Sequence, residues 1–323
     1  MAGYTPPFSI TSTILTQVSE ISELISDIKH IEAKKITPKL RKKNLVRSIT
    51  GSLQIEGNSF TEEKVTAMLD GKRVLGTVKE VEEVRGAIKA YEQMNSYDYA
   101  KMLDLLHSHK LMMGTILTNA GEFRSGNVGV YGKDGVSHVA PPPYRVNELM
   151  IDLFDWLATT KEHPLVVSSI FHYEFEFIHP FSDGNGRIGR LWQSVILIAY
   201  KELFSFIPIE SIVKENQQAY YDALEAAGSA GESTLFVEFM LESILKSLRD
   251  FLKNQKKSDQ KSNLKSDQKI LALMKKNAKI TIKEICVSTG LSESGVKKII
   301  KKLKEENIIA RIGALKSGYW EVR

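Results

Sequence analysis

The sequence predicts a mainly α-helical protein, with one β-hairpin in its main body and a smaller mixed module at its C-terminal end. Apolar residues recur at helical spacing in most long segments, which predicts helices over residues 10–31, 146–157, 165–178, 191–206 and 235–252. The exception is 121–144, where glycines, the alternating Val128 and Val130 and a closing Pro141-Pro142-Pro143 indicate a hairpin. Beyond residue 266, the spacing predicts three short helices and then two strands, 308–312 and 318–322.

The distribution of charge separates the same two parts of the chain. Residues 246–323 hold 20 Lys and Arg against 8 Asp and Glu, whereas residues 1–245 hold 24 against 31. A difference of this size indicates that the two parts have different partners. The polar, basic stretch 253–269 between them is typical of a solvated linker or of an exposed helical turn.

Composition excludes several classes of protein. A single cysteine, Cys286, rules out a disulfide scaffold and a zinc site with several cysteines, and it is typical of a reducing cytosol. The N-terminus lacks a basic start followed by an apolar stretch, so we expect no signal peptide. No run approaches the roughly 18 apolar residues of a membrane span. We therefore expect a cytoplasmic protein with no membrane partner.

The most informative stretch is 179–190, which reads HPFSDGNGRIGR. Its glycines, Gly184, Gly186 and Gly189, spell the G-x-G-x-x-G fingerprint of dinucleotide-binding folds, but that fingerprint should follow a buried strand of a βαβ unit. The preceding run carries two histidines and two glutamates that a central strand would not bury, and no alternation of strands and helices follows. We therefore reject a dinucleotide-binding fold.

The same stretch is suited to binding phosphates. Gly184 and Gly186 allow backbone N–H groups to approach an anion closely. A helix that begins at or near Arg187 adds the positive end of its dipole at the same point. Arg187 and Arg190 lie three residues apart on one face of that helix, so they can grip two successive phosphates.

Two further residues of the stretch suggest catalysis. Asp183 would repel a phosphate charge about 4 Å away by roughly 1–4 kcal/mol unless a cation such as Mg²⁺ lies between them. His179 is the nearby group that can take a proton near neutral pH. His172 is expected to be a hydrogen-bonded packing residue, because no third ligand for a zinc site with His179 lies nearby in the sequence.

At every defined position the stretch matches H-x-F-x-[D/E]-G-N-G-R-x-x-R, and so it resembles the Fic family. Residues 119–124 (NAGEFR) and Pro141-Pro142 resemble the segments on either side of the family's flap. The resemblance covers roughly residues 100–230. It implies a helical bundle that transfers AMP from ATP to a hydroxyl side chain of a target protein, and the intact G-N-G-R favours AMP transfer over the phosphorylation of Doc-like relatives.

By position, the resemblance implies a role for each motif residue. His179 would be the catalytic base for the incoming hydroxyl, and Asp183 would hold Mg²⁺ on the α- and β-phosphates. The contacts to ATP phosphates would come from Gly184, Asn185, Gly186, Arg187 and Arg190. Phe181 would point inward as an anchor, and Tyr220 and Tyr221 lie where relatives contact the adenine.

Ser52, Glu56 and Gly57 resemble the family's inhibitory motif, [S/T]-x-x-x-E-[G/N]. The stretch also fits a helix end with Gly57 as its cap, followed by a capping box at 59–62 that opens the next helix. This alternative leaves Glu56 unexplained, because an acid in the last turn faces the negative end of the dipole, at a cost of roughly 0.3–1 kcal/mol. We expect Glu56 to pair with Arg190 in place of the γ-phosphate, which would misorient ATP.

Residues 126–138 are expected to form the flap, which would align a target segment by strand addition. Val130 would then lie near the side chain that is modified. An ordinary surface hairpin is the alternative.

The C-terminal module resembles the winged helix-turn-helix that ends several Fic proteins. Its third helix carries a basic face, typical of a helix in the major groove of DNA, made of Lys297, Lys298, Lys301 and Lys302. Lysine is suited to phosphates more than to reading bases. DNA binding is therefore weighed against a module that docks a protein or forms a dimer.

The sequence thus predicts a self-inhibited protein adenylyltransferase, with ATP, Mg²⁺ and a target protein as partners. Its parts would be a helical region with the inhibitory motif (1–100), the catalytic core (101–245), a basic linker (246–266) and the winged helix-turn-helix (267–323). Self-modification, removal of AMP from targets and a homodimer stay open. The competing hypothesis is a DNA-binding regulator whose Fic core has a minor or autogenous activity.

Overall fold

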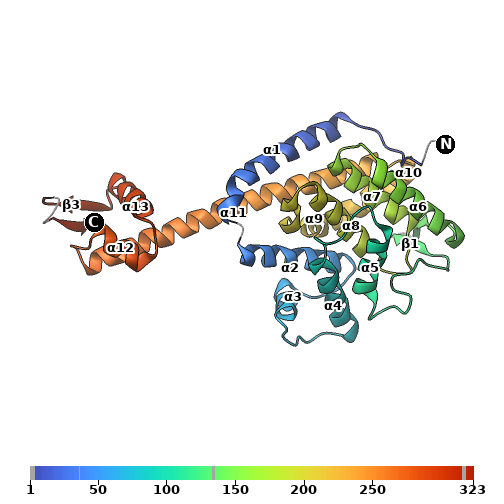
Figure 1. Ribbon diagram of the computed structural model, residues 1–323, viewed down its shortest axis with the longest axis horizontal. Helices are drawn as coiled ribbons and strands as arrows, with labels where there is room; N and C mark the ends of the chain where they lie inside the picture. Colours follow the sequence, from blue (N-terminus) through green and yellow to red (C-terminus); the bar gives the residue numbers. More distant parts are fainter. Residues whose placement is uncertain (1–3, 36, 133–134, 315–317) are drawn as a thin grey trace. The chain divides into compact units, whose positions relative to one another are not determined.

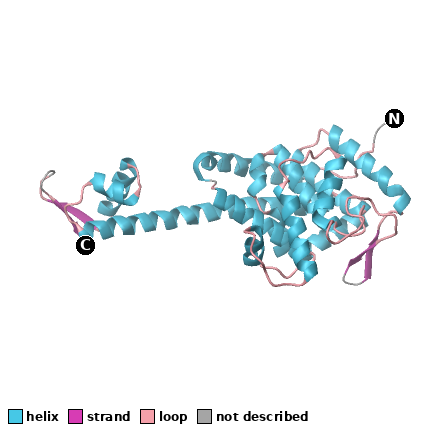
Figure 2. Ribbon diagram, turned by 60° about the horizontal axis from the view of Figure 1, so that its bottom comes forward, coloured by secondary structure: helices cyan, strands magenta, loops and turns pink. Residues whose placement is uncertain are grey.

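The computed structural model describes residues 4–35, 37–132, 135–314 and 318–323, with side chains outside 29–35, 130–139 and 255–265. The protein is mainly α-helical, as predicted, and its strands form two separate antiparallel pairs (Figures 1 and 2). Its contacts divide it into two compact units, Met1–Asp250 and Phe251–Arg323. Within the described residues, no helix combines the length and the apolar character that crossing a membrane requires.

The first unit consists of helices and one hairpin, which lies at the edge of the helices (Figure 2). The helices before the hairpin are α1 (Ser12–Lys35), α2 (Pro38–Ile55), α3 (Glu62–Leu69), α4 (Val78–Glu92) and α5 (Met102–Met113). The hairpin consists of β1 (Gly129–Gly132) and β2 (Gly135–Val139). The elements after it are α6 (Pro143–Thr159), α7 (Pro164–Ile178), α8 (Asn185–Tyr200), the 3₁₀ helix η1 (Glu202–Phe206), α9 (Ile209–Glu215), α10 (Gln217–Ala230) and α11 (Thr234–Lys276).

The structure differs from two of the predictions. The prediction of a single helix over 191–206 was wrong. Helix α8 ends at Tyr200, Lys201 has an extended backbone conformation, and the short η1 follows. The capping box at 59–62 was also wrong: Thr61, directly before α3, is the N-cap, while Ser59 donates its hydroxyl to Glu80. The segment 246–266 is helical, since it lies inside α11.

Helices α7 and α8 form the centre of the first unit. All but a few side chains of α7 are buried, polar ones included, so neighbouring elements cover this helix on nearly every side. Gly189 of α8 allows the two helices to approach closely, because a Cβ atom there would lie 2.9 Å from a carboxylate oxygen of Glu176. Gly51 does the same for α2, where a Cβ atom would lie 2.8 Å from the backbone of Glu210 in α9. The end of α2 is thereby held against the centre of the unit.

The second unit consists of three helical pieces and a strand pair. The pieces are the end of α11, α12 (Ile282–Thr289) and α13 (Glu293–Glu305), and the strands are β3 (Ile309–Ile312) and β4 (Tyr319–Val322). A capping box between Thr281 and Glu284 begins α12, and Gly290, with φ of 70°, ends it. The core of this unit is formed by Ile270, Met274, Ile280, Ile285, Val296, Ile300, Leu303, Ile309 and Trp320. The predicted mixed module is confirmed.

Candidate active site

His179 lies at the C-terminal end of α7, in a left-handed backbone conformation with φ of 50° and ψ of 59°. Such a conformation is costly for a residue other than glycine and persists only where its surroundings impose it. The Nδ1 atom lies 3.3 Å from the carbonyl oxygen of Glu176, which can only accept a hydrogen bond. Nδ1 therefore carries the proton, and Nε2 keeps the lone pair that a general base needs.

Arg124 holds the backbone of this histidine in place. Its Nε donates to the carbonyl oxygen of His179 at 2.7 Å, and its backbone N–H donates to Pro180 at 2.9 Å. Its other two nitrogens donate to the carbonyl oxygens of Gly126 and Pro141, at 2.9 and 2.6 Å, on either side of the hairpin. Arg124 is buried, so one guanidinium joins His179 to both ends of the hairpin segment.

Asn185 braces the loop that follows His179. Its side chain donates to the carbonyl oxygen of Phe181 at 2.9 Å and accepts from the backbone N–H of Phe181 at 2.8 Å. Phe181 is fully buried, which confirms its expected inward orientation. The Asn185 side chain is thus committed to the loop, and its backbone N–H is the group that remains for an anion.

His109, in α5, packs against the same loop. Its ring stacks on Phe181 with 3.6 Å between ring centroids, and its Nδ1 accepts from the backbone N–H of Gly121 at 2.8 Å. Nε2 consequently carries the proton and donates to the carbonyl oxygen of Asp183 at 3.0 Å. Burial lowers the pKa of His109 to about 4, so the ring stays neutral at neutral pH.

The N-terminal end of α8 has the features of an anion site. Gly184 precedes it with φ of 88°, a conformation suited to glycine, and Asn185 begins the helix near the predicted position. Arg187 is buried, with its guanidinium 3.5 Å from Glu83 and 2.9 Å from Asp183. Its Nε is buried without a hydrogen-bond partner, while its other guanidinium nitrogens face the two carboxylates.

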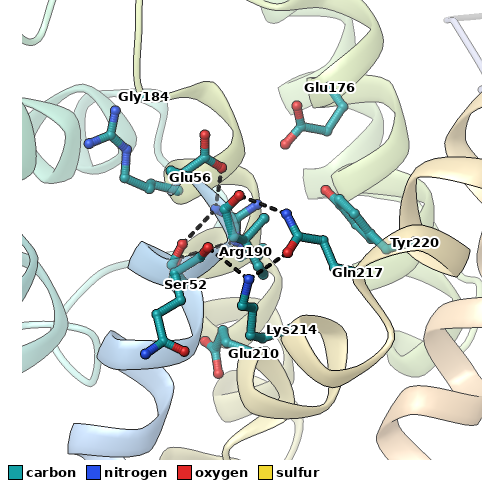
Figure 3. A network of polar contacts seen from close by, with 12 residues as sticks. Ser52, Glu56, Glu176, Gly184, Arg190, Glu210, Lys214, Gln217 and Tyr220 are labelled. Atoms are coloured by element: carbon teal, nitrogen blue, oxygen red, sulfur yellow. Dashed lines mark hydrogen bonds and ion pairs between the residues drawn. The ribbon is translucent and has the colours of Figure 1, made fainter. Parts of the chain in front are cut away.

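Glu56 occupies the other side of this site, as Figure 3 shows. Its Oε1 lies 2.6 Å from Nη2 of Arg190, so the predicted pairing is present. Although burial opposes its charge, the Glu56 carboxylate raises the pKa of Arg190 above its ordinary value. A Cβ atom on Gly186 would lie only 2.6 Å from the same Oε1. The carboxylate therefore lies directly against the glycine that was predicted to contact a phosphate.

The remaining residues of the predicted inhibitory motif support that contact. Ser52 is buried, and both its hydroxyl and its carbonyl oxygen accept from Arg190, at 3.2 and 3.1 Å. Gly57 follows the end of α2 with φ of 87°. Three polar groups of one helical turn thus meet Arg190, which fixes the direction of its guanidinium.

Asp183 is suited to a metal that also binds substrate. Its side chain is 47% exposed, and its Oδ1 accepts from Arg187 and from the backbone N–H of Gly184. The described residues contain no group of three His, Cys, Asp or Glu able to form a closed metal site. One carboxylate completed by phosphate oxygens and water is an arrangement that Mg²⁺ accepts.

The two tyrosines of α10 differ in their surroundings. Tyr220 is buried, and its hydroxyl lies 3.1 Å from Nε2 of His172, which speaks against a direct contact with adenine. Tyr221 is 43% exposed and lies beside the end of α2, 3.5 Å from the carbonyl oxygen of Ile55. His172 is buried and bonded to Gln193 at 2.7 Å on its other nitrogen, so its predicted packing role is confirmed.

The structure brings His179, Asp183, the G-N-G-R residues, Arg190 and Glu56 together, but not every predicted residue. Val130 belongs to β1, opposite His138, and its side chain lies outside the described residues. The predicted DNA-contacting lysines all lie on α13 of the second unit. Arg124 and His109 were missed as functional residues, because a lone basic residue bonded to distant backbone leaves no spacing signal.

Comparisons with known proteins found similar sequences and structures. Residues 99–197 match the Fic/DOC family, and residues 264–310 match the winged helix-turn-helix DNA-binding family. A crystal structure of a Fic family protein from Desulfovibrio desulfuricans G20 is 39% identical, covers 99% of this chain and 98% of that chain, and has a TM-score of 0.76. Fic-1 from C. elegans is 22% identical, and the match covers 76% of this chain and 72% of that chain. Its TM-score of 0.60 shows a similar fold.

Curated relatives match part of the chain. The protein adenylyltransferase Fic of Culex quinquefasciatus is 30% identical over 212 residues, and that of Aedes aegypti 29% over the same length. Each match covers 62% of this chain and 40% of the relative. The chain therefore spans about two fifths of the length of the curated relatives that it matches.

Proposed function

Because the chain belongs to the Fic/DOC family, we propose that its first unit is a protein adenylyltransferase, which transfers AMP from ATP to a hydroxyl side chain of a target protein. One observation carries the proposal: a histidine with a free Nε2 lies four residues before a carboxylate, and both adjoin a glycine-lined helix end with two buried arginines. That arrangement supplies a base and cationic contacts for several phosphates.

In the proposed reaction, Nε2 of His179 takes the proton of the target hydroxyl, and the oxygen attacks the α-phosphorus of ATP. The bond from the α-phosphorus to the bridging oxygen breaks, and pyrophosphate leaves. Backbone N–H groups at Gly184–Gly186, with Arg187 and Arg190, would stabilise the charge on the phosphates. Mg²⁺ held by Asp183 would add further stabilisation of that charge.

We also propose that Glu56 inhibits the enzyme. Its carboxylate lies on Arg190 and against Gly186, where a terminal phosphate would otherwise be bound. ATP could then bind only with its phosphates displaced, and the α-phosphorus would miss the line of attack.

A labelling experiment tests the proposed reaction. The full chain carrying Glu56→Gly is incubated with Mg²⁺ and ATP labelled in either the α- or the γ-phosphate, with candidate targets and the protein itself as acceptors. Adenylylation predicts protein-bound label from the α-phosphate alone, and loss of that label when EDTA removes the metal. Protein-bound label from the γ-phosphate would instead identify a kinase and contradict AMP transfer.

The second unit supports a second function, DNA binding. Its match to a winged helix-turn-helix DNA-binding family and the exposed lysines of α13 favour contacts with phosphates. Two of the four predicted lysines have partners at hydrogen-bond distance within the unit, since Lys302 lies 2.8 Å from Asp267 and Lys297 lies 2.7 Å from Glu293. The ion pair of Lys301 with Glu305 is longer, at 3.8 Å. Lys298 and Lys301 are therefore the stronger candidates for DNA contacts.

This proposal predicts a steep dependence of duplex affinity on salt. Each neutralised phosphate contributes a slope of about −0.9 to log K against log salt concentration, so the pair Lys298→Ala and Lys301→Ala should reduce the slope by about 2. Affinity of the full chain for a random duplex would be measured across salt concentrations. Lys79→Ala, in the first unit, is the control and should leave the slope unchanged. No duplex binding at low salt would exclude this function and favour a protein-docking module.

A further inference from the structure

The C-terminal turn of α2 is held by side chains from two later helices. A helix end leaves its last carbonyl oxygens without intrahelical partners. Here Nζ of Lys214, in α9, donates to the carbonyl oxygen of Gln54 at 2.9 Å. The side-chain amide of Gln217, in α10, donates to the carbonyl oxygen of Ile55 at 2.9 Å (Figure 3). Each of these carbonyls lies within two residues of Glu56.

The two capping residues also bind each other. Nζ of Lys214 donates to Oε1 of Gln217 at 2.6 Å, while Nε2 of the same amide faces the helix end. Both oxygen and nitrogen of Gln217 are thus used, which fixes its orientation. We call Lys214 and Gln217 the latch pair.

Lys214 also corrects an electrostatic conflict. Glu56 follows the last turn of α2, where the helix dipole is negative and a carboxylate is disfavoured. The ammonium group of Lys214 lies at that same end, where a cation is favoured. The positive charge of Lys214 offsets the unfavourable position of the Glu56 carboxylate, which also pairs with Arg190.

The last turn of α2 is therefore held from two directions. Arg190 contacts Ser52 and Glu56, whereas the latch pair donates hydrogen bonds to the last carbonyl oxygens of the helix. Only the contacts of Arg190 overlap the predicted phosphate site. Loss of the hydrogen bonds from the latch pair would loosen the turn while leaving the predicted catalytic residues and Glu56 itself unchanged.

We propose that Lys214 and Gln217 are positioning residues for the inhibitory carboxylate, clamping the end of α2 so that Glu56 stays on Arg190. The proposal rests on the inhibitory function proposed for Glu56. Gln217 also lies 3.3 Å from the hydroxyl of Tyr221, the exposed aromatic of α10, so the latch pair adjoins the predicted adenine side of the site.

Two readouts test the latch pair in the full chain. Gln217→Ala and Lys214→Met are made with Glu56 present and with Glu56→Gly, and transfer of α-labelled AMP to protein is measured. With Glu56 present, each variant should increase transfer by about tenfold. This factor corresponds to the free energy of one hydrogen bond to a charged group. With Glu56→Gly, neither should change transfer by more than about twofold, because the carboxylate that they position is absent.

The second readout needs no protein acceptor. Glu56 competes for the γ-phosphate, so release should raise affinity for ATP more than affinity for ADP, as measured by calorimetry. Gln218→Ala is the matched control, since this amide lies next along α10 and donates to Asp222 at 2.6 Å. Thermal unfolding of each variant verifies that it is folded.

The possible outcomes separate the two hypotheses. Activation by Glu56→Gly without activation by the latch variants would overturn the latch. Equal activation in both backgrounds would overturn it as well, because the effect would not act through Glu56. If Glu56→Gly changes neither readout, the proposed inhibition itself fails, and the latch fails with it.

Discussion

Replacing His179 with alanine in the Glu56→Gly background is expected to reduce AMP transfer by about 100- to 10,000-fold, the range for loss of a general base. Nδ1 of His179 faces a carbonyl oxygen, which leaves Nε2 to accept the proton of the target hydroxyl. The nearby His109 cannot replace it, because its Nδ1 already accepts a hydrogen bond and its Nε2 donates one. The measurement is single-turnover transfer from α-labelled ATP.

Two controls separate chemistry from folding in this experiment. ATP affinity should be unchanged, because the proposed phosphate contacts come from α8 and not from His179. His179→Asn is the matched variant, since asparagine tolerates the left-handed conformation observed at this position better than alanine does. Both variants should be folded and show this reduction; transfer at a near-native rate in either would refute His179 as the base.

Replacing Glu56 with glycine alone is expected to increase AMP transfer by about 10- to 100-fold, because a charged hydrogen bond contributes about 1.5–3 kcal/mol. The change removes the carboxylate that lies 2.6 Å from Arg190 and clears the approach to Gly186. The γ-phosphate can then take the place of the carboxylate. The measurement is the initial rate of transfer at fixed ATP concentration.

The same variant should be less stable without nucleotide. Arg190 is buried, and removal of its partner leaves a buried charge unpaired. ATP should therefore raise the melting temperature of Glu56→Gly more than that of the native chain, because ligand binding stabilises by mass action. Glu56→Gln, which keeps the shape and loses the charge, should lie between them. An unchanged rate in Glu56→Gly would be incompatible with the inhibitory role.

The sequence predicted the parts of the site that are close together along the chain. From His179 to Arg190 the residue types follow one another on a turn and the first helical turns, so their proximity is local. The pairing of Glu56 with Arg190 was predicted from the resemblance of Ser52, Glu56 and Gly57 to the family's inhibitory motif, together with the unfavourable position of an acid at a helix end.

The missed residues share a different character. Arg124, Lys214 and Gln217 act through backbone carbonyl oxygens that are distant in the sequence or belong to another helix. Every residue has such a carbonyl, so no pattern of side chains marks the partner. Tyr220 illustrates the reverse difficulty: its position along the chain suggested adenine, but only the packing against His172 reveals that it is buried.

The contacts of Arg124 have a consequence for evolution. They join His179 to Gly126 and Pro141 through carbonyl oxygens, and mutation of a side chain does not remove a carbonyl oxygen. The hairpin between those two anchor points can therefore diverge in sequence while His179 keeps its position. Under the proposed function, sequence change in that short interval would alter the choice of target protein without moving His179.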